Sequence, residues 1–343
     1  MMPKDKFSTF LLTAASASLL LLSCGKPDRR ATSTPPPDLH LKIERLDKDL
    51  FAMADDTTGN FNLRLYAKYG EFYRTYVEDV LHAAAFNDPR LPLALSHFVH
   101  NPDWASVQRT ADSVLGDMSE QEAEFNEAFG HLKQYFPDSL TPRIIAFNSG
   151  FDYGVLPTDS VLSFGVEWFV GKDSPVTQFL PPEDFPQYRK DRMRPDMLVP
   201  NVVKGWLQVH YTRDVRGGDL LTNFIEIGKV MALLDALLPE TDASLKFAYT
   251  PQQLKWCEDN EFNVWKEIVA KELLYSKDNK EIDRFMSDGP FTSGFPRESP
   301  GHIGEWIGYR MVEGYLEKNP DVTFAQLFAM HDPQAILKTY KPR

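Results

Sequence analysis

The feature that most constrains this chain is an export segment at its amino terminus. Two lysines precede an apolar stretch from Phe10 to Leu22. The stretch is too short to span a bilayer but has the length of a signal-peptide core. It ends in Leu21-Leu22-Ser23-Cys24, which has the pattern of a lipobox; the alternative is an ordinary signal peptide that ends near a cysteine by chance. We expect residues 1–23 to be a lipoprotein signal peptide and Cys24 to become the lipidated first residue.

The residues after Cys24 have the composition of a tether. The segment 24–39 contains Pro35-Pro36-Pro37 among small and polar residues, a composition typical of stiff, solvated linkers. Several acyl chains on one cysteine hold a protein stably on a membrane that it does not span. We therefore expect the membrane to be a partner through the N-terminal acyl chains. The expected location is the cell envelope, with the anchor in the outer membrane.

Amino-acid composition favours a globular domain and argues against a nucleic-acid-binding protein. The chain has 343 residues, of which 43% are hydrophobic and 13% aromatic, so residues 40–343 can form a sizeable core and are expected to be a single globular domain. The net charge of −12 argues against nucleic acid as a partner, because such binding depends on neutralising phosphates. Cys257 has no intramolecular partner once Cys24 is acylated, and we expect it to be a buried apolar residue.

Hydrophobic periodicity predicts an α+β fold, mainly helical with a small central sheet. Residues 40–140 show helical spacing, for example at Phe61, Leu65 and Tyr69. Short apolar runs predict two or three strands within about 143–170, the last over Ser160–Val170. The helical pattern resumes over 198–343. Two of its helices are expected to open at a capping residue followed by proline, at Thr250-Pro251 and at Ser299-Pro300.

The sequence offers few groups for catalysis. It contains no phosphate-binding loop, no nucleophile elbow and no His-Glu-x-x-His motif, and no third ligand can be named for His97 and His100. Glu226 lies in an apolar helix with Lys229 three residues on, and Glu261 lies on a later helix. Each glutamate is either an ordinary helix-surface charge or a buried carboxylate that could act as a base.

Three glycines share nearly one face of the helix expected after Ser299-Pro300. Gly301, Gly304 and Gly308 are interpreted as packing glycines that let a neighbouring backbone approach closely. The alternative is that they admit a ligand to the backbone.

Several segments in order resemble a known family. They are Gly228-Lys229, Leu234-Asp235-Ala236-Leu237-Leu238-Pro239, Glu298-Ser299-Pro300-Gly301-His302-Ile303-Gly304-Glu305-Trp306-Ile307-Gly308 and Tyr340-Lys341-Pro342. Together with the lipobox, they are similar to the gliding-motility lipoprotein B (GldB) family. The resemblance implies a lipid-anchored envelope protein required by a gliding or associated protein-secretion machine, with other envelope proteins of that machine as partners.

The layout also looks like that of a family of predicted zinc proteases. In that comparison the helix Glu226–Leu238 stands where His-Glu-x-x-His would be, but Gly228, Lys229 and Ala232 occupy the motif positions. Glu261 could match the third zinc ligand of that family. One carboxylate alone cannot hold zinc, however, because a catalytic zinc ion takes three protein ligands. The resemblance therefore implies a degenerate, zincin-like scaffold with no metal and no cofactor.

These observations lead to three hypotheses. The favoured one is a non-catalytic, lipid-anchored component of a gliding motility or secretion machine. The first alternative is a divergent metal-dependent peptidase or hydrolase, with Glu226 or Glu261 as the base. The second alternative is a glycan- or solute-binding lipoprotein that uses its tryptophans as stacking platforms.

Overall fold

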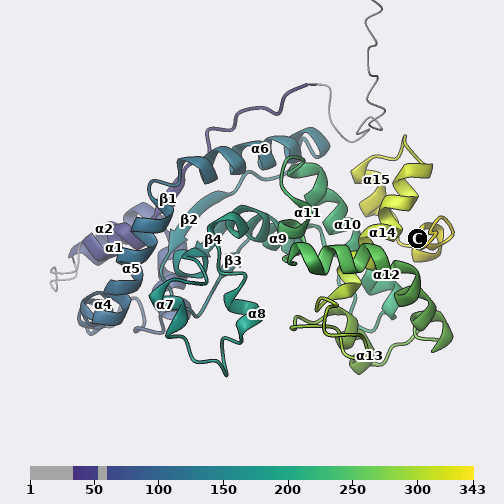
Figure 1. Ribbon diagram of the computed structural model, residues 1–343. Coiled ribbons are helices and arrows are strands. Elements are labelled where there is room, and N and C mark those ends of the chain that lie inside the picture. Colours follow the sequence, from purple (N-terminus) through teal and green to yellow (C-terminus); the bar gives the residue numbers. More distant parts are fainter. Residues whose placement is uncertain (1–33, 53–59) are drawn as a thin grey trace, which may run out of the picture.

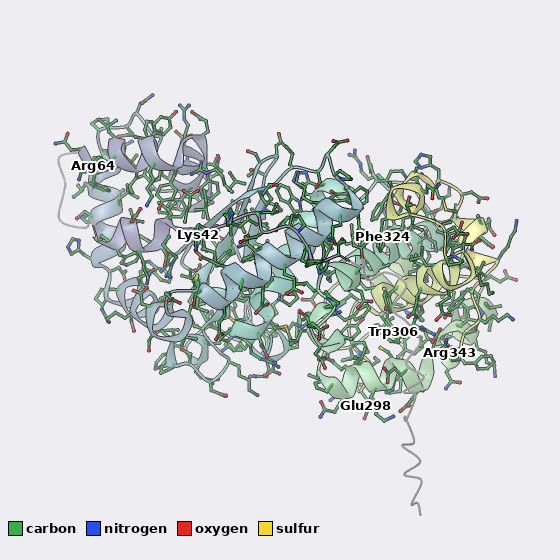
Figure 2. The ribbon with its side chains drawn as sticks, turned by 90° about the horizontal axis from the view of Figure 1, so that it is seen from above. Lys42, Arg64, Glu298, Trp306, Phe324 and Arg343 are labelled. Atoms are coloured by element: carbon green, nitrogen blue, oxygen red, sulfur yellow. The ribbon has the colours of Figure 1, made fainter. Side chains whose placement is uncertain are left out.

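The computed structural model describes residues 34–52 and 60–343 and shows an α+β protein, mainly helical, around one small sheet (Figure 1). The molecule is elongated: the amino-terminal helices form one end and the carboxy-terminal helices the other. A view turned by 90° places Arg64 and Arg343 at these opposite ends (Figure 2). The predicted fold class is confirmed. The signal peptide and Cys24 lie outside the described residues.

The sheet has four strands in the order β1-β2-β4-β3. Strands β1, β2 and β4 are parallel, and β3 runs antiparallel to β4. Their bounds are β1 (Ile43–Arg45), β2 (Arg143–Phe147), β3 (Val155–Pro157) and β4 (Val161–Gly165). Strand β4 is buried along its whole length and β2 is buried after its first residue, as expected for parallel strands covered by helices on both faces.

Two hydrophobic clusters cover the two faces of the sheet. Successive side chains of a strand point to opposite faces, so Ile144 and Ala146 of β2 join the larger cluster, whereas Ile145 and Phe147 join the smaller one. The smaller cluster is built by α1 (Leu46–Ala52), α2 (Asn60–Tyr69), α3 (Glu71–Thr75), a π-helical turn (Tyr76–Val80) and α4 (Leu91–His100). The larger cluster receives residues from α5 (Pro102–Leu115), α6 (Ser119–Tyr135) and the carboxy-terminal helices.

The carboxy-terminal half wraps around one buried helix. Helix α10 (Leu220–Leu237) is buried on nearly all sides, in keeping with its apolar sequence. The other helices of the second half are α7 (Pro175–Gln178), α8 (Gln187–Lys190), α9 (Leu198–Tyr211), α11 (Ala243–Lys246), α12 (Pro251–Ala270), α13 (Asn279–Met286), α14 (Ile303–Lys318), α15 (Phe324–Ala329) and α16 (Pro333–Leu337), with 3-10 turns at Val166–Phe169 and Pro195–Met197. Among the described residues, no helix combines the length and apolar character needed to cross a membrane.

Three boundaries differ from the sequence-based expectations. Strand β1 lies inside the range 40–140 that we expected to be helical, because three residues are too few for a periodic signal and their pairing with β2 is distant in sequence. The strand expected over Ser160–Val170 ends at Gly165. The helix expected from Ser299-Pro300 begins at Ile303, because the Ser299 hydroxyl accepts a hydrogen bond from the Thr292 amide instead of capping a helix.

Candidate functional site

Glu226 and Lys229 form a buried ion pair within α10. The two side chains lie three residues apart on the helix, with exposed fractions of 5% and 1%. Lys229 Nζ donates to Glu226 Oε1 at 2.9 Å and to the carbonyl oxygen of Met330 at 2.7 Å. Arg213 approaches the same carboxylate at 3.8 Å. The carboxylate therefore has a fixed cationic partner inside the protein.

Glu261 is buried on α12 and pairs with a different cation. Arg310 of α14 donates from Nε to Glu261 Oε2 at 3.1 Å, and the same guanidinium pairs with Glu313. The nearby Tyr340 hydroxyl has its pKa raised, first by burial and then by the Glu261 charge. The structure thus gives Glu226 and Glu261 separate cationic partners and does not unite them in one shared ion-pair network.

The remaining metal and cysteine candidates are placed as follows. His97 and His100 are both exposed in the last turn of α4. Within 34–52 and 60–343, no group of three or more His, Cys, Asp or Glu side chains has an arrangement that could hold a metal ion. Cys257 is free and buried, and burial raises the pKa of its thiol.

The glycines lie where helices meet. A Cβ atom on Gly308 would collide with the backbone of Phe224 in α10, and one on Gly228 would collide with Gly308 itself. A Cβ on Gly304 would lie 2.7 Å from the Phe224 ring. Gly301 precedes α14 and lies against Gly289. In this structure the close approach of α10 and α14 depends on Gly228 and Gly308.

A polar network that the sequence did not reveal lies at the carboxyl ends of the parallel strands. Asp47 follows β1 and is fully buried; it accepts hydrogen bonds from Arg45 and from Gln108 Nε2 at 2.9 Å. Gln108 in turn accepts a hydrogen bond from Asn148, which follows β2. Carboxyl ends of parallel strands are the usual position of ligand sites in α/β sheets.

Glu167, which follows β4, fixes the loop after β2. Its Oε1 accepts hydrogen bonds from the Ser149 amide at 2.8 Å, from the Ser149 hydroxyl and from the Phe151 amide at 3.1 Å. Burial raises the pKa of this carboxyl to about 7. Its Oε2 is buried and has no hydrogen-bond partner in the described part of the chain. Gly150 and Phe151 have positive φ angles of 69° and 70°, a conformation that a non-glycine residue adopts only where its surroundings hold it.

These features define the class of protein: a mainly helical α+β protein in which Glu226 and Glu261, the candidate bases named from the sequence, are buried ion-pair partners. The family model described as gliding motility protein GldB matches residues 27–342. Because this match covers most of the chain, the protein belongs to that family and is related to gliding motility. No curated protein and no solved structure matches. The zincin-like comparison therefore stays a prediction.

Proposed function

We propose that this protein is a lipid-anchored, non-catalytic component of a gliding motility or associated protein-secretion machinery in the cell envelope. Membership of the gliding motility family supports the role in motility. The lipobox ending at Cys24 supports the anchor. The ion pair between Glu226 and Lys229 is the main observation that supports a non-catalytic role.

The geometry of this pair leaves Glu226 poorly suited to act as a base. A general base must come within hydrogen-bond reach of the proton that it removes, directly or through one water. Glu226 is 5% exposed, and Lys229 Nζ lies 2.9 Å from its Oε1. Glu261 is 2% exposed and is engaged by Arg310. We infer that both carboxylates stabilise the packing of the helices that carry them.

The start of the described chain bears on the anchor. Residues 34–37, at the end of the segment interpreted as a tether, lie against α6: Gln134 donates to the carbonyl oxygens of Thr34 and Pro35. Ten residue steps separate Cys24 from Thr34 and can span at most about 35 Å. An acyl anchor on Cys24 would therefore keep this end of α6 within that distance of the membrane. We propose the outer membrane as its location.

Complementation of a deletion strain tests the proposal. The strain receives either the wild-type gene or Cys24→Ala, and surface spreading and the amount of protein released into the medium are scored. We expect deletion to abolish at least one trait and only the lipidatable form to restore it. Survival of both traits after deletion would contradict the proposed role in motility and secretion.

Metal analysis of the purified protein tests the non-catalytic part separately. Elemental analysis that finds one zinc ion per chain would overturn it, because a divergent metallopeptidase would then be the better account. A metal content well below stoichiometric agrees with the proposal.

A further inference from the structure

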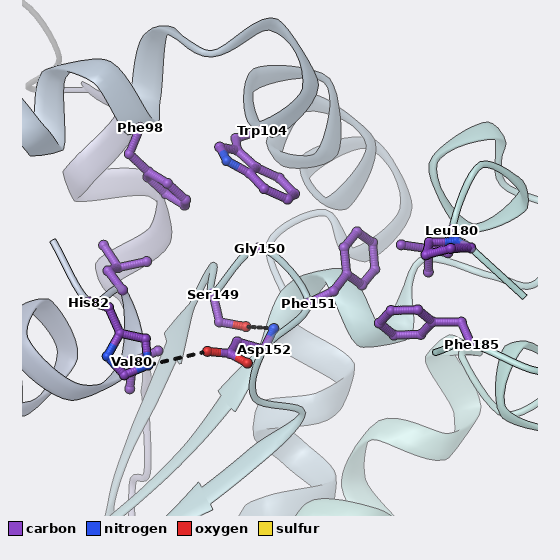
Figure 3. Close-up of a pocket in the computed structure, with 12 residues that line it drawn as sticks. Val80, His82, Phe98, Trp104, Ser149, Gly150, Phe151, Asp152, Leu180 and Phe185 are labelled. Atoms are coloured by element: carbon purple, nitrogen blue, oxygen red, sulfur yellow. Dashed lines mark hydrogen bonds and ion pairs between the residues drawn. The ribbon is translucent and has the colours of Figure 1, made fainter. Parts of the chain in front are cut away.

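A pocket of about 420 Å³ opens beside the loop that follows β2 (Figure 3). Ser149, Gly150 and Asp152 line one side of it. Phe98 of α4 and Trp104 of α5 line another, and Phe151 and Phe185 a third (Figure 3). The volume is within the range of small-molecule sites.

Aromatic rings on two sides give the pocket its chemical character. Phe98 and Trp104 are stacked, with ring centroids 6.0 Å apart. Phe151 and Phe185 meet edge to face, with centroids 5.9 Å apart. Aromatic side chains attract cations through the negative potential of their ring faces, most strongly in the case of tryptophan.

The charges around the pocket also favour a cation. Asp152 lines it with a side chain that is 54% exposed, and the imidazole of His82 lies 3.7 Å from its carboxylate. None of the lining residues is a lysine or an arginine, and the cation of Lys190 is engaged beneath the lining residue Leu180, to whose carbonyl oxygen its Nζ donates at 2.6 Å. Six acidic residues lie within two positions of a lining residue, and Glu78 among them is paired with Arg74: Glu78, Asp79, Asp103, Asp152, Glu183 and Asp184. Asp152 is the one carboxylate among the lining residues, and it would attract a cation in the pocket.

The wall that carries Asp152 is held in place before any ligand arrives. The three hydrogen bonds to Glu167 fix Ser149 and Phe151. A Cβ on Gly150 would lie 3.2 Å from the Trp104 ring, so the glycine lets this ring rest on the loop. Glu167 is therefore a positioning residue for the pocket, since it touches the loop and does not line the cavity.

We propose that this pocket binds the cationic side chain, arginine or lysine, of a basic segment in a partner protein. Phe179, which is 89% exposed, precedes the lining residue Leu180 and extends the apolar surface beyond the pocket. Residues that flank the bound cation can pack against this surface. A protein segment therefore matches the pocket and its surroundings better than an isolated small cation does.

Ligand-observed saturation-transfer NMR on the full-length protein in maltoside micelles tests the proposal. The probes are N-acetylarginine amide and N-acetylcitrulline amide, which share a shape and differ in charge. We expect the arginine probe to bind at least about tenfold more tightly than the citrulline probe. Trp104→Leu should weaken arginine binding by about tenfold, and Asp152→Asn, which removes an exposed ion-pair partner, by about two- to fivefold.

Matched controls keep the test specific. Asp214→Asn removes a carboxylate of similar exposure, 56%, that does not line the pocket, and Trp256→Leu removes a partly buried tryptophan outside it. Both variants should bind the arginine probe as wild type does. The side chain of Asp152 is exposed, so Asp152→Asn should not destabilise the hydrophobic core. This variant therefore still tests the proposal if Trp104→Leu does not fold.

Three results would overturn the proposal. The first is equal binding of the arginine and citrulline probes, and the second is unchanged binding of the arginine probe by the Asp152→Asn protein. The third is displacement of the arginine probe by methyl glucoside at similar concentration, which would make the pocket a carbohydrate site. Because the readout is binding, none of these results depends on whether the protein serves motility.

Discussion

Glu167 gives the protein a specific dependence of stability on pH. Its carboxyl is fully buried at the end of β4, and burial raises its pKa from 4.5 to about 7. Between these two values the native protein keeps a proton that the unfolded chain has released. The free energy of unfolding should therefore fall as the pH rises from about 4.5 to about 7, and should change no further through this group above pH 7.

The magnitude follows from the two pKa values. The interval from 4.5 to about 7 is about 2.5 pH units. At about 1.4 kcal/mol per unit, ionising Glu167 lowers the free energy of unfolding by about 3.5 kcal/mol in all, of which about 3 kcal/mol falls between pH 4.5 and pH 8. Glu167→Gln stays neutral at every pH, and its amide oxygen can still accept hydrogen bonds from Ser149 and Phe151. The substitution should therefore remove this part of the pH dependence.

Urea unfolding at pH 4.5 and pH 8 measures the effect. At each pH, the unfolding free energy of wild type is subtracted from that of Glu167→Gln. This difference should be about 3 kcal/mol more positive at pH 8 than at pH 4.5, because wild type is destabilised at pH 8 and the variant is not. Taking differences removes the contribution of every other titrating group, and Glu258→Gln on the exposed side of α12 is the control. The same difference at both pH values would refute the assigned pKa and the role of burial.

Two further predictions concern the packing of α10 against its neighbours. Gly308→Ala should lower the free energy of unfolding by at least about 3 kcal/mol, because its Cβ would collide with the Phe224 carbonyl oxygen. Gly314→Ala on the same helix has room for the added methyl group and should raise the free energy of unfolding by up to about 1 kcal/mol. Equal effects of the two substitutions in chemical denaturation would contradict the close packing of α14 against α10 at Gly308. Lys229→Met should cost about 3 kcal/mol, because it leaves the buried Glu226 with Arg213 at 3.8 Å in place of a hydrogen-bonded cation, and adding Glu226→Leu should recover most of this loss. Additive losses in that double-mutant cycle would show that the pair is not coupled.

Local signals were enough to predict many of the helices. Thr250-Pro251 predicted the start of α12, and the structure shows a capping box there that includes Gln253. Ser299-Pro300 carries a similar signal, but the Ser299 hydroxyl is used by Thr292, so α14 begins three residues later. A capping residue predicts a helix only when no tertiary partner takes its side chain.

The candidate site was predictable only in part. The spacing of Glu226 and Lys229 predicted their pairing, but burial of both depends on residues as distant as Met330. Glu167 and Ser149 were missed because they meet only when β2 and β4 lie side by side, which single-strand patterns do not specify. The turn Gly150-Phe151-Asp152-Tyr153-Gly154 after a buried strand was the available signal for a site at this edge of the sheet.

The most direct test of the central claim is cell tracking of a deletion strain that carries the Glu226→Leu/Lys229→Met protein. An account in which this ion pair only supports the fold predicts gliding at wild-type speed, provided that the variant accumulates to wild-type levels. If the double variant accumulates in the membrane fraction and the cells do not glide, the pair has a role beyond packing. The claim that the ion pair only supports the fold would then be contradicted.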